Sequence, residues 1–244
     1  MQVKYDNFIN YAHRGASEYC PENTLLSFYT GIFMGANGIE TDVQLTKDSV
    51  LVLFHDHTLE RVTGEKGCVE DYTFNELQSF NVKKNSFTDK IISFEDLLYH
   101  FSHKDLTFAI ELKGDKTAKP TADLLRKYNM QNKTIVTSFK FNELEDLKSY
   151  APEFKAGYLA LEVVDEALLS KMKRLGIEEL CPRATVITKE KVKNWKEQGF
   201  EVRAWGVTDE TIMKDIFDSG INGMTVNFPD KLTQYYLQTK GLNK

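Results

Sequence analysis

Two histidines, several acids and an arginine lie close together in sequence near the start of the chain. They occur in the segments Ala12-His13-Arg14-Gly15, Pro21-Glu22-Asn23-Thr24, Glu40-Thr41-Asp42 and His55-Asp56, and another acid and a lysine follow at Glu111-Leu112-Lys113. Histidine transfers protons near neutral pH, carboxylates are hard oxygen ligands for divalent metals, and arginine and lysine bind phosphate. Together these residue types indicate metal-assisted hydrolysis of a phosphate ester.

The elements that position these residues follow an alternating pattern of strand-like and helix-like segments, which is typical of a parallel α/β protein. Strands are predicted at 8–12, 38–46, 50–55, 106–113, 133–138, 155–160, 178–182, 201–207 and 223–227. Helices are predicted at 24–34, 93–101, 120–128, 142–150, 165–175, 189–198, 210–218 and 230–238.

Nine strands are one too many for a (β/α)8 barrel. Only residues 47–49 separate Thr46 from Val50, and a parallel crossover needs a dozen residues or more, so these two runs must pair antiparallel. A two-residue turn there would place Thr46 opposite Ser49, and Glu40 opposite His55. The other eight runs predict a single (β/α)8 TIM-barrel domain over residues 1–244, with a small insertion after the second strand at about 46–92.

The predicted strands bring the candidate residues to one end of the barrel. Glu40 and Asp42 are two residues apart on one strand and share a face, as Glu111 and Lys113 do on another. His13 closes the first strand. The carboxyl ends of barrel strands form the usual active-site face, so we expect these side chains to converge there.

Three acids in one place repel each other unless a cation lies among them. Oxygen ligands favour magnesium, calcium or manganese over zinc or copper, so we expect one divalent cation, Mg²⁺ or Ca²⁺ with Mn²⁺ as a further option, at Glu40, Asp42 and Glu111. The alternative is that these acids pair with Arg14 and Lys113 instead.

The remaining candidates are assigned by their type and position. Arg14 and Lys113 are interpreted as phosphate contacts, because arginine in particular matches two phosphate oxygens. Glu22 precedes a helix start, where Asn23 or Thr24 provides the cap, and we expect Glu22 to orient His13. Trp205, near the end of the seventh barrel strand, either stacks on a substrate or fills the rim.

The amino-acid composition limits the partners that the protein could bind and the compartment in which it could act. The 244 residues carry a formal net charge of −5 with no Lys/Arg block longer than a pair, which argues against nucleic acid. No apolar run approaches the length that spans a membrane, and the first residues lack the apolar core of a signal peptide. The three cysteines are widely separated, so we expect a reducing, cytoplasmic environment. The oligomeric state stays open.

These motifs resemble the glycerophosphodiester phosphodiesterase family. The resemblance is carried by His-Arg-Gly at 13–15, Pro-Glu-Asn-Thr at 21–24, Glu-Thr-Asp at 40–42, the hairpin into His55-Asp56 and Glu-Leu-Lys at 111–113, and it extends through Trp205 to Asp230. It implies a (β/α)8 barrel with a small insertion. It also implies metal ligands at Glu40, Asp42 and Glu111, acid/base roles for His13 and His55, and phosphate contacts from Arg14 and Lys113.

Two segments depart from the family pattern. Residues 204–209 differ from the usual Trp-Thr-Val-Asn sequence at Gly206 and Thr208, and residues 222–227 end in Asn227 where an aspartate is usual. We expect both departures to concern the rim and the leaving-group side of the site.

The resemblance implies hydrolysis of glycerophosphodiesters, such as glycerophosphocholine and glycerophosphoethanolamine, to sn-glycerol 3-phosphate and an alcohol. His13 is assigned as base and His55 as acid, and the attacking oxygen belongs to water or to the glycerol 2-hydroxyl. A lysophospholipase D or sphingomyelinase D-like enzyme is the nearest alternative, but it needs an apolar rim, and residues 63–88 are mostly polar with scattered apolar side chains. A non-catalytic barrel that binds phosphodiesters is the alternative of another class.

Overall fold

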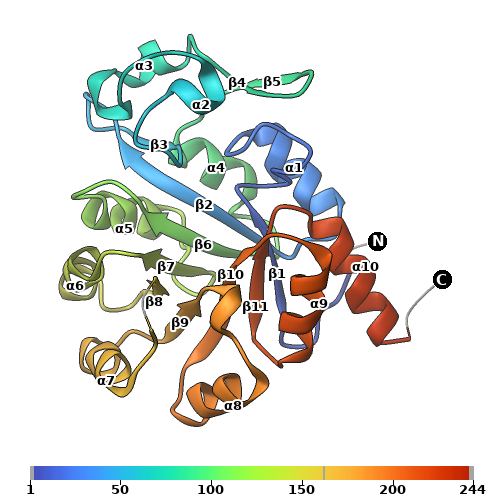
Figure 1. Ribbon diagram of the computed structural model, residues 1–244. Coiled ribbons are helices and arrows are strands. Elements are labelled where there is room, and N and C mark those ends of the chain that lie inside the picture. Colours follow the sequence, from blue (N-terminus) through green and yellow to red (C-terminus); the bar gives the residue numbers. More distant parts are fainter. Residues whose placement is uncertain (1–2, 162, 242–244) are drawn as a thin grey trace.

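The computed structural model describes residues 3–161 and 163–241, and in these residues eight parallel strands close into a barrel (Figure 1). The strands follow the order β1-β11-β10-β9-β8-β7-β6-β2, and pairing of β1 with β2 closes the ring. The predicted (β/α)8 fold is therefore confirmed. The barrel strands are β1 Ile9–His13, β2 Gly38–Leu45, β6 Thr107–Leu112, β7 Thr134–Ser138, β8 Lys155–Ala160, β9 Glu179–Pro182, β10 Glu201–Val207 and β11 Gly223–Val226.

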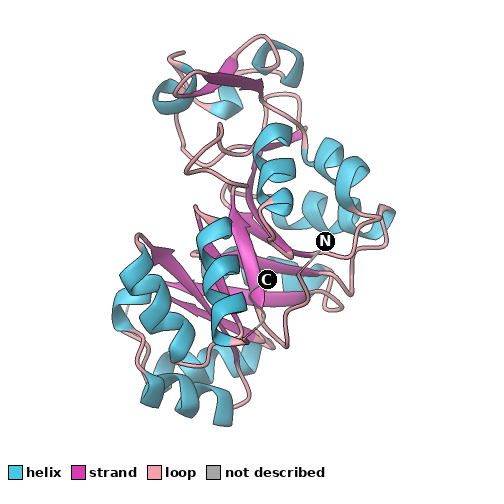
Figure 2. Ribbon diagram, turned by 90° about the vertical axis from the view of Figure 1, so that its right-hand side faces the viewer, coloured by secondary structure: helices cyan, strands magenta, loops and turns pink. Residues whose placement is uncertain are grey.

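A helix follows each barrel strand and packs on the outside of the ring (Figures 1 and 2). Several helices begin at a side chain that accepts a backbone N–H, among them Thr24, Ser93 and Asp209, because the first turn leaves such donors unsatisfied. The helices are α1 Leu25–Phe33, α4 Phe94–Phe101, α5 Ala118–Lys127, α6 Phe141–Tyr150, α7 Glu166–Leu175, α8 Lys189–Glu197, α9 Glu210–Asp218 and α10 Pro229–Thr239, with a 3₁₀ turn, η2 Ala184–Val186, before α8.

The two faces of the barrel strands differ in chemistry. Outward residues such as Ile39 and Val43 are fully buried in the main apolar core. The interior holds a buried ion pair instead, in which Arg203 Nε lies 3.1 Å from Glu179 Oε2 and Arg203 NH1 donates to Thr225 Oγ1 at 2.8 Å. Gly157 leaves room for this pair, since a Cβ there would lie 2.8 Å from Glu179 Oε2. The floor beneath the barrel mouth is therefore polar and rigidly packed.

The segment between β2 and α4 forms a small subdomain at the top of Figure 1, and Figure 2 shows it projecting beyond the barrel. It has an apolar core of its own, which includes Phe54, Leu59, Val69 and Leu77. The aromatic residues 72, 74 and 80 pack against this core, so most of the apolar side chains of residues 63–88 stabilise the insertion and do not line a rim. Its elements are β3 Leu51–Leu53, α2 Glu60–Thr63, η1 Val69–Asp71, α3 Phe74–Leu77, β4 Asn81–Lys84 and β5 Phe87–Lys90.

The hairpin from β2 to β3 is antiparallel as predicted, but its register is shifted by one residue. Leu45 pairs with Leu51, so Thr46 faces Val50 and not Ser49. The turn contains three residues, because Ser49 adopts a left-handed φ of 62° and Thr46 Oγ1 accepts from the Val50 N–H at 2.9 Å. The predicted placement of Glu40 opposite His55 was therefore wrong.

None of the helices in the described ranges combines the length and apolar character needed to cross a bilayer.

Candidate active site

Strand register brings the three predicted metal-binding acids together. On neighbouring strands His13 is level with Glu40, and Asp42 is level with Glu111. The carboxylates of Glu40, Asp42 and Glu111 are buried, and each offers an oxygen within 4.8 Å of the others. Side chains that are 71 residues apart in sequence thus form one cluster at the carboxyl ends of β2 and β6.

The electrostatics of this cluster suit a cation. Burial, together with the charges of neighbouring carboxylates, raises the pKa of Glu40 to about 8 and that of Glu111 to about 7. Burial would also raise the pKa of Asp42, but the adjacent Arg14 lowers it well below its usual value. Asp42 Oδ1 is buried without a hydrogen-bond partner. An orphaned carboxylate oxygen within an all-oxygen set fits a hard divalent cation.

Arg14 and Lys113 also pair with these acids, which was the alternative considered from sequence. Arg14 Nε lies 3.3 Å from Asp42 Oδ2, and Lys113 Nζ lies 3.1 Å from Glu111 Oε1. Glu40 forms no ion pair with a lysine or arginine among the described residues; its Oε2 lies 3.9 Å from His13 Nε2 and 3.3 Å from the Arg14 backbone nitrogen. Arg14 and Lys113 therefore balance the charge of the three acids only in part.

His13 is held in a defined orientation by Asn227. Its Nδ1 donates to Asn227 Oδ1 at 2.5 Å, and the Ser17 hydroxyl donates to the same oxygen at 3.0 Å. Burial and the charge of Arg14 lower the pKa of His13 to about 3. The imidazole is therefore neutral at ordinary pH, with an unprotonated Nε2 directed at the carboxylate cluster. The departure from the family pattern at Asn227 therefore also concerns a candidate catalytic residue, which the sequence did not indicate.

His55 reaches the same site from the insertion. The chain leaves the β2–β3 ladder after Leu53, and Gln44 Nε2 holds the following turn by donating to the carbonyls of Phe54 and Asp56. His55 Nδ1 donates to Asp56 Oδ1 at 2.7 Å, while Lys113 Nζ donates to His55 Nε2 at 3.0 Å. Burial lowers the pKa of His55. This anchored turn compensates for the shifted register and still delivers the ring to the barrel mouth.

Glu22 has a different partner from the one predicted. No hydrogen bond joins it to His13 in the described chain; instead it accepts from Arg14 NH1 at 2.9 Å and from both terminal nitrogens of Arg61 at 2.7 and 2.8 Å. Arg61, on α2 of the insertion, also donates to Asp56. Sequence reasoning missed Arg61, because an arginine on a short polar segment carries no motif.

Asn23 belongs to the site, whereas Thr24 provides the helix cap. Thr24 Oγ1 accepts from the Ser27 N–H, and Asn23 adopts a left-handed φ of 57° that turns its amide inward. Asn23 Nδ2 donates to Asp42 Oδ2 at 3.0 Å, and its Oδ1 accepts from Thr41 at 2.8 Å. Asn23 therefore orients Asp42.

A cavity of about 270 Å³ opens above the cluster. It is lined by the two histidines, Arg14, two of the acids, Arg203 and Trp205, among others. The Trp205 ring meets the edge of Phe139 at a centroid distance of 5.1 Å, and its indole nitrogen is buried without a partner. Trp205 therefore packs into the rim and also presents a free donor beside the cavity.

The carboxyl ends of parallel barrel strands are the established catalytic face of this architecture. Here that face carries two oriented imidazoles and two cations around buried carboxylates. Such a fold and site define a hydrolase of phosphoric diesters. Residues 13–231 match the glycerophosphoryl diester phosphodiesterase family, and the chain belongs to that family.

Individual relatives match over nearly their whole length. YqiK, an uncharacterized protein of Bacillus subtilis, is 32% identical over 232 residues, which cover 91% of this chain and 95% of YqiK. A glycerophosphodiester phosphodiesterase of Caldanaerobacter subterraneus is 30% identical over 230 residues, covering 91% and 94%. An Oleispira antarctica phosphodiesterase, solved in complex with the product sn-glycerol-3-phosphate, shares the fold with a TM-score of 0.85 at 23% identity, covering 93% and 96%.

Proposed function

We propose that this enzyme hydrolyses glycerophosphodiesters such as glycerophosphocholine and glycerophosphoethanolamine to sn-glycerol 3-phosphate and an alcohol, in a reaction that depends on a divalent cation. The observation that carries the proposal is the pair of imidazoles, each fixed at Nδ1, beside one buried carboxylate cluster: His13 Nε2 faces Glu40, and His55 Nε2 contacts Lys113, which pairs with Glu111. Family membership and the relative that was solved with sn-glycerol-3-phosphate support this choice of substrate.

The proposed binding mode places the glycerol phosphate in the 270 Å³ cavity, which Arg14, His13 and His55 line. Arg14 and Lys113 would exchange part of their carboxylate contacts for phosphate oxygens. Glu40, Asp42 and Glu111 would hold Mg²⁺ or Ca²⁺, with Mn²⁺ as a substitute. When bound, the cation supplies positive charge that stabilises the negative charge growing on the phosphate.

The two histidines are given opposite roles in proton transfer. His13 Nε2, unprotonated and directed inward, takes the proton of the attacking oxygen, which belongs to water or to the glycerol 2-hydroxyl. His55 lines both the central cavity and a larger one beside it, so it lies where an alcohol would leave. In the structure its Nε2 accepts from Lys113, so His55 takes up a proton at that atom when the lysine turns to the phosphate, and then gives this proton to the leaving oxygen as the phosphorus–oxygen bond breaks. The large cavity is walled by the insertion, so we treat residues 46–92 as part of the same catalytic domain.

Release of sn-glycerol 3-phosphate from glycerophosphocholine tests the proposal. With added divalent cation the wild-type enzyme should form the product, and His13→Ala and His55→Ala should each lower kcat by roughly two to four powers of ten. Cyclic phosphate in the ³¹P NMR spectrum of either variant would identify the glycerol 2-hydroxyl as the attacking group. Wild-type kcat in either variant would remove that histidine from the mechanism. If no condition gives turnover, and chelator does not change the melting temperature, the non-catalytic barrel would be favoured.

One observation favours a second candidate, a lysophospholipase D-like activity. Leu161 and Val163, after β8, are exposed, and Leu161 and Phe139 line a cavity of about 350 Å³ beside Glu111 and Lys113. An acyl chain could lie along this apolar shelf. Faster turnover of lysophosphatidylcholine than of glycerophosphocholine would favour the second candidate.

We also propose that the enzyme acts in the cytoplasm. All three cysteines are free, and Cys20 and Cys181 are buried. Free thiols support a reducing compartment. Cell fractionation with an antibody against the chain tests this location.

A further inference from the structure

The larger cavity beside the active site has walls from two distant parts of the chain. Its volume is about 790 Å³, and we call it the lysine cavity. One wall is the insertion and the hairpin that leads into it, and the other is formed by the loops after β6 and β7. Its lining residues are Gln44, Leu45, Thr46, Lys47, Ser49, His55, His57, Val69, Glu70, Lys113, Gly114, Asp115, Lys116 and Lys140.

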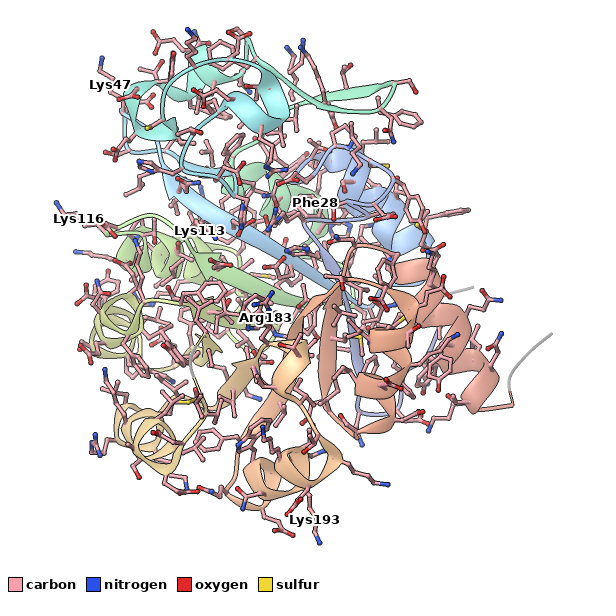
Figure 3. The ribbon with its side chains drawn as sticks, in the orientation of Figure 1. Phe28, Lys47, Lys113, Lys116, Arg183 and Lys193 are labelled. Carbon is pink, nitrogen blue, oxygen red and sulfur yellow. The ribbon has the colours of Figure 1, made fainter. Side chains whose placement is uncertain are left out.

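The lysine cavity is positively charged within an acidic protein. Four lysines face two acids, whereas the whole chain carries a net charge of −5. Lys140 is paired with Asp115 at 2.6 Å and Lys113 with Glu111 at 3.1 Å. Lys47 and Lys116 are exposed and, among the described residues, have no ion pair with any carboxylate (Figure 3). Their charges are therefore available to a ligand.

The lysine cavity adjoins the catalytic site. His55 lines both cavities, and Lys113 Nζ donates to His55 Nε2 at their junction. A phosphate held between Lys113 and the carboxylate cluster would have its glycerol in the smaller cavity. Its leaving alcohol would then extend toward Lys47 and Lys116.

The lining chemistry selects among leaving alcohols. A quaternary ammonium such as choline is bound by aromatic faces, and none of the described residues that line the lysine cavity is Phe, Tyr or Trp. Unpaired lysines attract a negative charge instead. Resting on the proposed function, we propose that the preferred substrates are glycerophosphodiesters whose leaving alcohol carries a negative charge of its own, such as a second phosphate.

Two substrates that differ by one phosphate test this specificity. Hydrolysis of glycerophosphoglycerol releases neutral glycerol. Hydrolysis of the same compound phosphorylated on its terminal hydroxyl releases an anionic alcohol, glycerol phosphate. We expect kcat/KM to be about tenfold higher for the phosphorylated compound at low ionic strength. This preference should shrink in 0.5 M salt, because screening weakens attraction between exposed charges.

The double variant Lys47→Gln/Lys116→Gln should abolish the preference and leave the melting temperature nearly unchanged, since neither exposed side chain forms an ion pair with any described residue. Lys193→Gln is the matched control, because Lys193 is an exposed lysine at the opposite end of the molecule (Figure 3). It should leave both rates unaltered.

The outcomes separate the two proposals. Failure to hydrolyse any glycerophosphodiester would overturn the proposed function. Hydrolysis of both compounds at equal rates, or a preference that survives in the double variant, would overturn only the anionic subsite. Faster turnover of lysophosphatidylcholine than of the phosphorylated compound would assign the leaving group to the apolar shelf and likewise contradict the lysine subsite.

Discussion

At the scale of single residues, the hydrogen bond from His13 to Asn227 decides which imidazole nitrogen is free. The Asn227 amide oxygen also accepts from Ser17, which fixes that oxygen as the acceptor of the His13 Nδ1–H. The lone pair is thereby kept on Nε2, the atom that faces Glu40. An aspartate at position 227, usual in the resembled pattern, could accept the same bond.

Replacing Asn227 tests this positioning role. Asn227→Leu should lower kcat by about 10- to 100-fold with a smaller change in KM, because the ring loses the bond that sets its tautomer and orientation. Asn227→Asp keeps an acceptor and should retain kcat within a few-fold. Steady-state kinetics on glycerophosphocholine measure both. Equal kcat for the leucine variant and the wild-type enzyme would show that His13 does not depend on Asn227.

The sequence predicted site residues well where a motif and a strand end coincide. Glu40, Asp42 and Glu111 do meet, because period-two alternation and parallel register leave little freedom in their placement. The partners of His13 and Glu22 could not be predicted in the same way. They depend on side-chain directions at turns, where Arg14 and Asn23 adopt left-handed φ values of 53° and 57° that no local pattern specifies.

At the scale of elements, Arg61 is one of the residues that tie the insertion to the barrel mouth. Arg61 on α2 contacts Asp56, which orients His55, and Glu22, which contacts Arg14. Helix α2 contains only Glu60–Thr63 and cannot be rigid by itself. Its position therefore depends on this pair of ion contacts and on the small core of the insertion.

Arg61→Ala should lower kcat/KM by about tenfold or more and increase proteolytic cleavage within residues 46–92, because Asp56 and Glu22 lose their shared partner. Arg126→Ala is the matched control: Arg126 also contacts two acids, Asp123 and Glu153, but on the outer surface. Among the described residues neither of these acids contacts His13, His55 or the carboxylate cluster, so the control should change neither quantity. Identical kinetics and cleavage in the two variants would show that Arg61 has no special role.

The hairpin shows the limit of element-level prediction. The short spacing between 46 and 50 was enough to establish an antiparallel pair, but a two-residue and a three-residue turn fit that spacing equally well. Two features select the three-residue turn: the Thr46 hydroxyl accepts from the Val50 N–H, and Ser49 adopts a left-handed φ. Both become visible only in the structure. A shift of one residue exchanges strand faces, and the anchored turn at Gln44 restores the position of His55.

At the scale of the whole molecule, the barrel was predictable because its signals are redundant. Eight apolar strands, each followed by an amphipathic helix, define the ring, and an error of one or two residues at any boundary leaves the topology unchanged. Cavities have no such redundancy. The lysine cavity combines residues from 44 to 140 and exists only because the insertion folds against the loops after β6 and β7.

The fold holds the three carboxylates close together although their negative charges repel each other. We therefore expect the stability of the folded protein to depend on pH. Without a cation the folded chain keeps protons on Glu40 and Glu111, whose pKa values are raised by burial from 4.5 to about 8 and about 7. A group whose pKa is higher in the folded than in the unfolded state stabilises the fold at a pH below its unfolded-state pKa. This stabilisation is lost as the pH rises through its folded-state pKa. The pKa values of His13 and His55 are lowered in the folded state, so below about pH 6.5 these histidines make the fold less stable as the pH falls. The informative window is therefore pH 6.5 to 8.

The melting temperature of cation-stripped protein, measured at pH 6.5 and pH 8 with and without Mg²⁺ or Mn²⁺, tests the central claim that these acids form a cation site. We expect a lower melting temperature at pH 8 than at pH 6.5 in chelator, and a cation-induced rise that is larger at pH 8. The variant Glu40→Gln/Glu111→Gln should lose both effects. A wild-type melting temperature that neither falls over this window nor responds to the cations would contradict the claim.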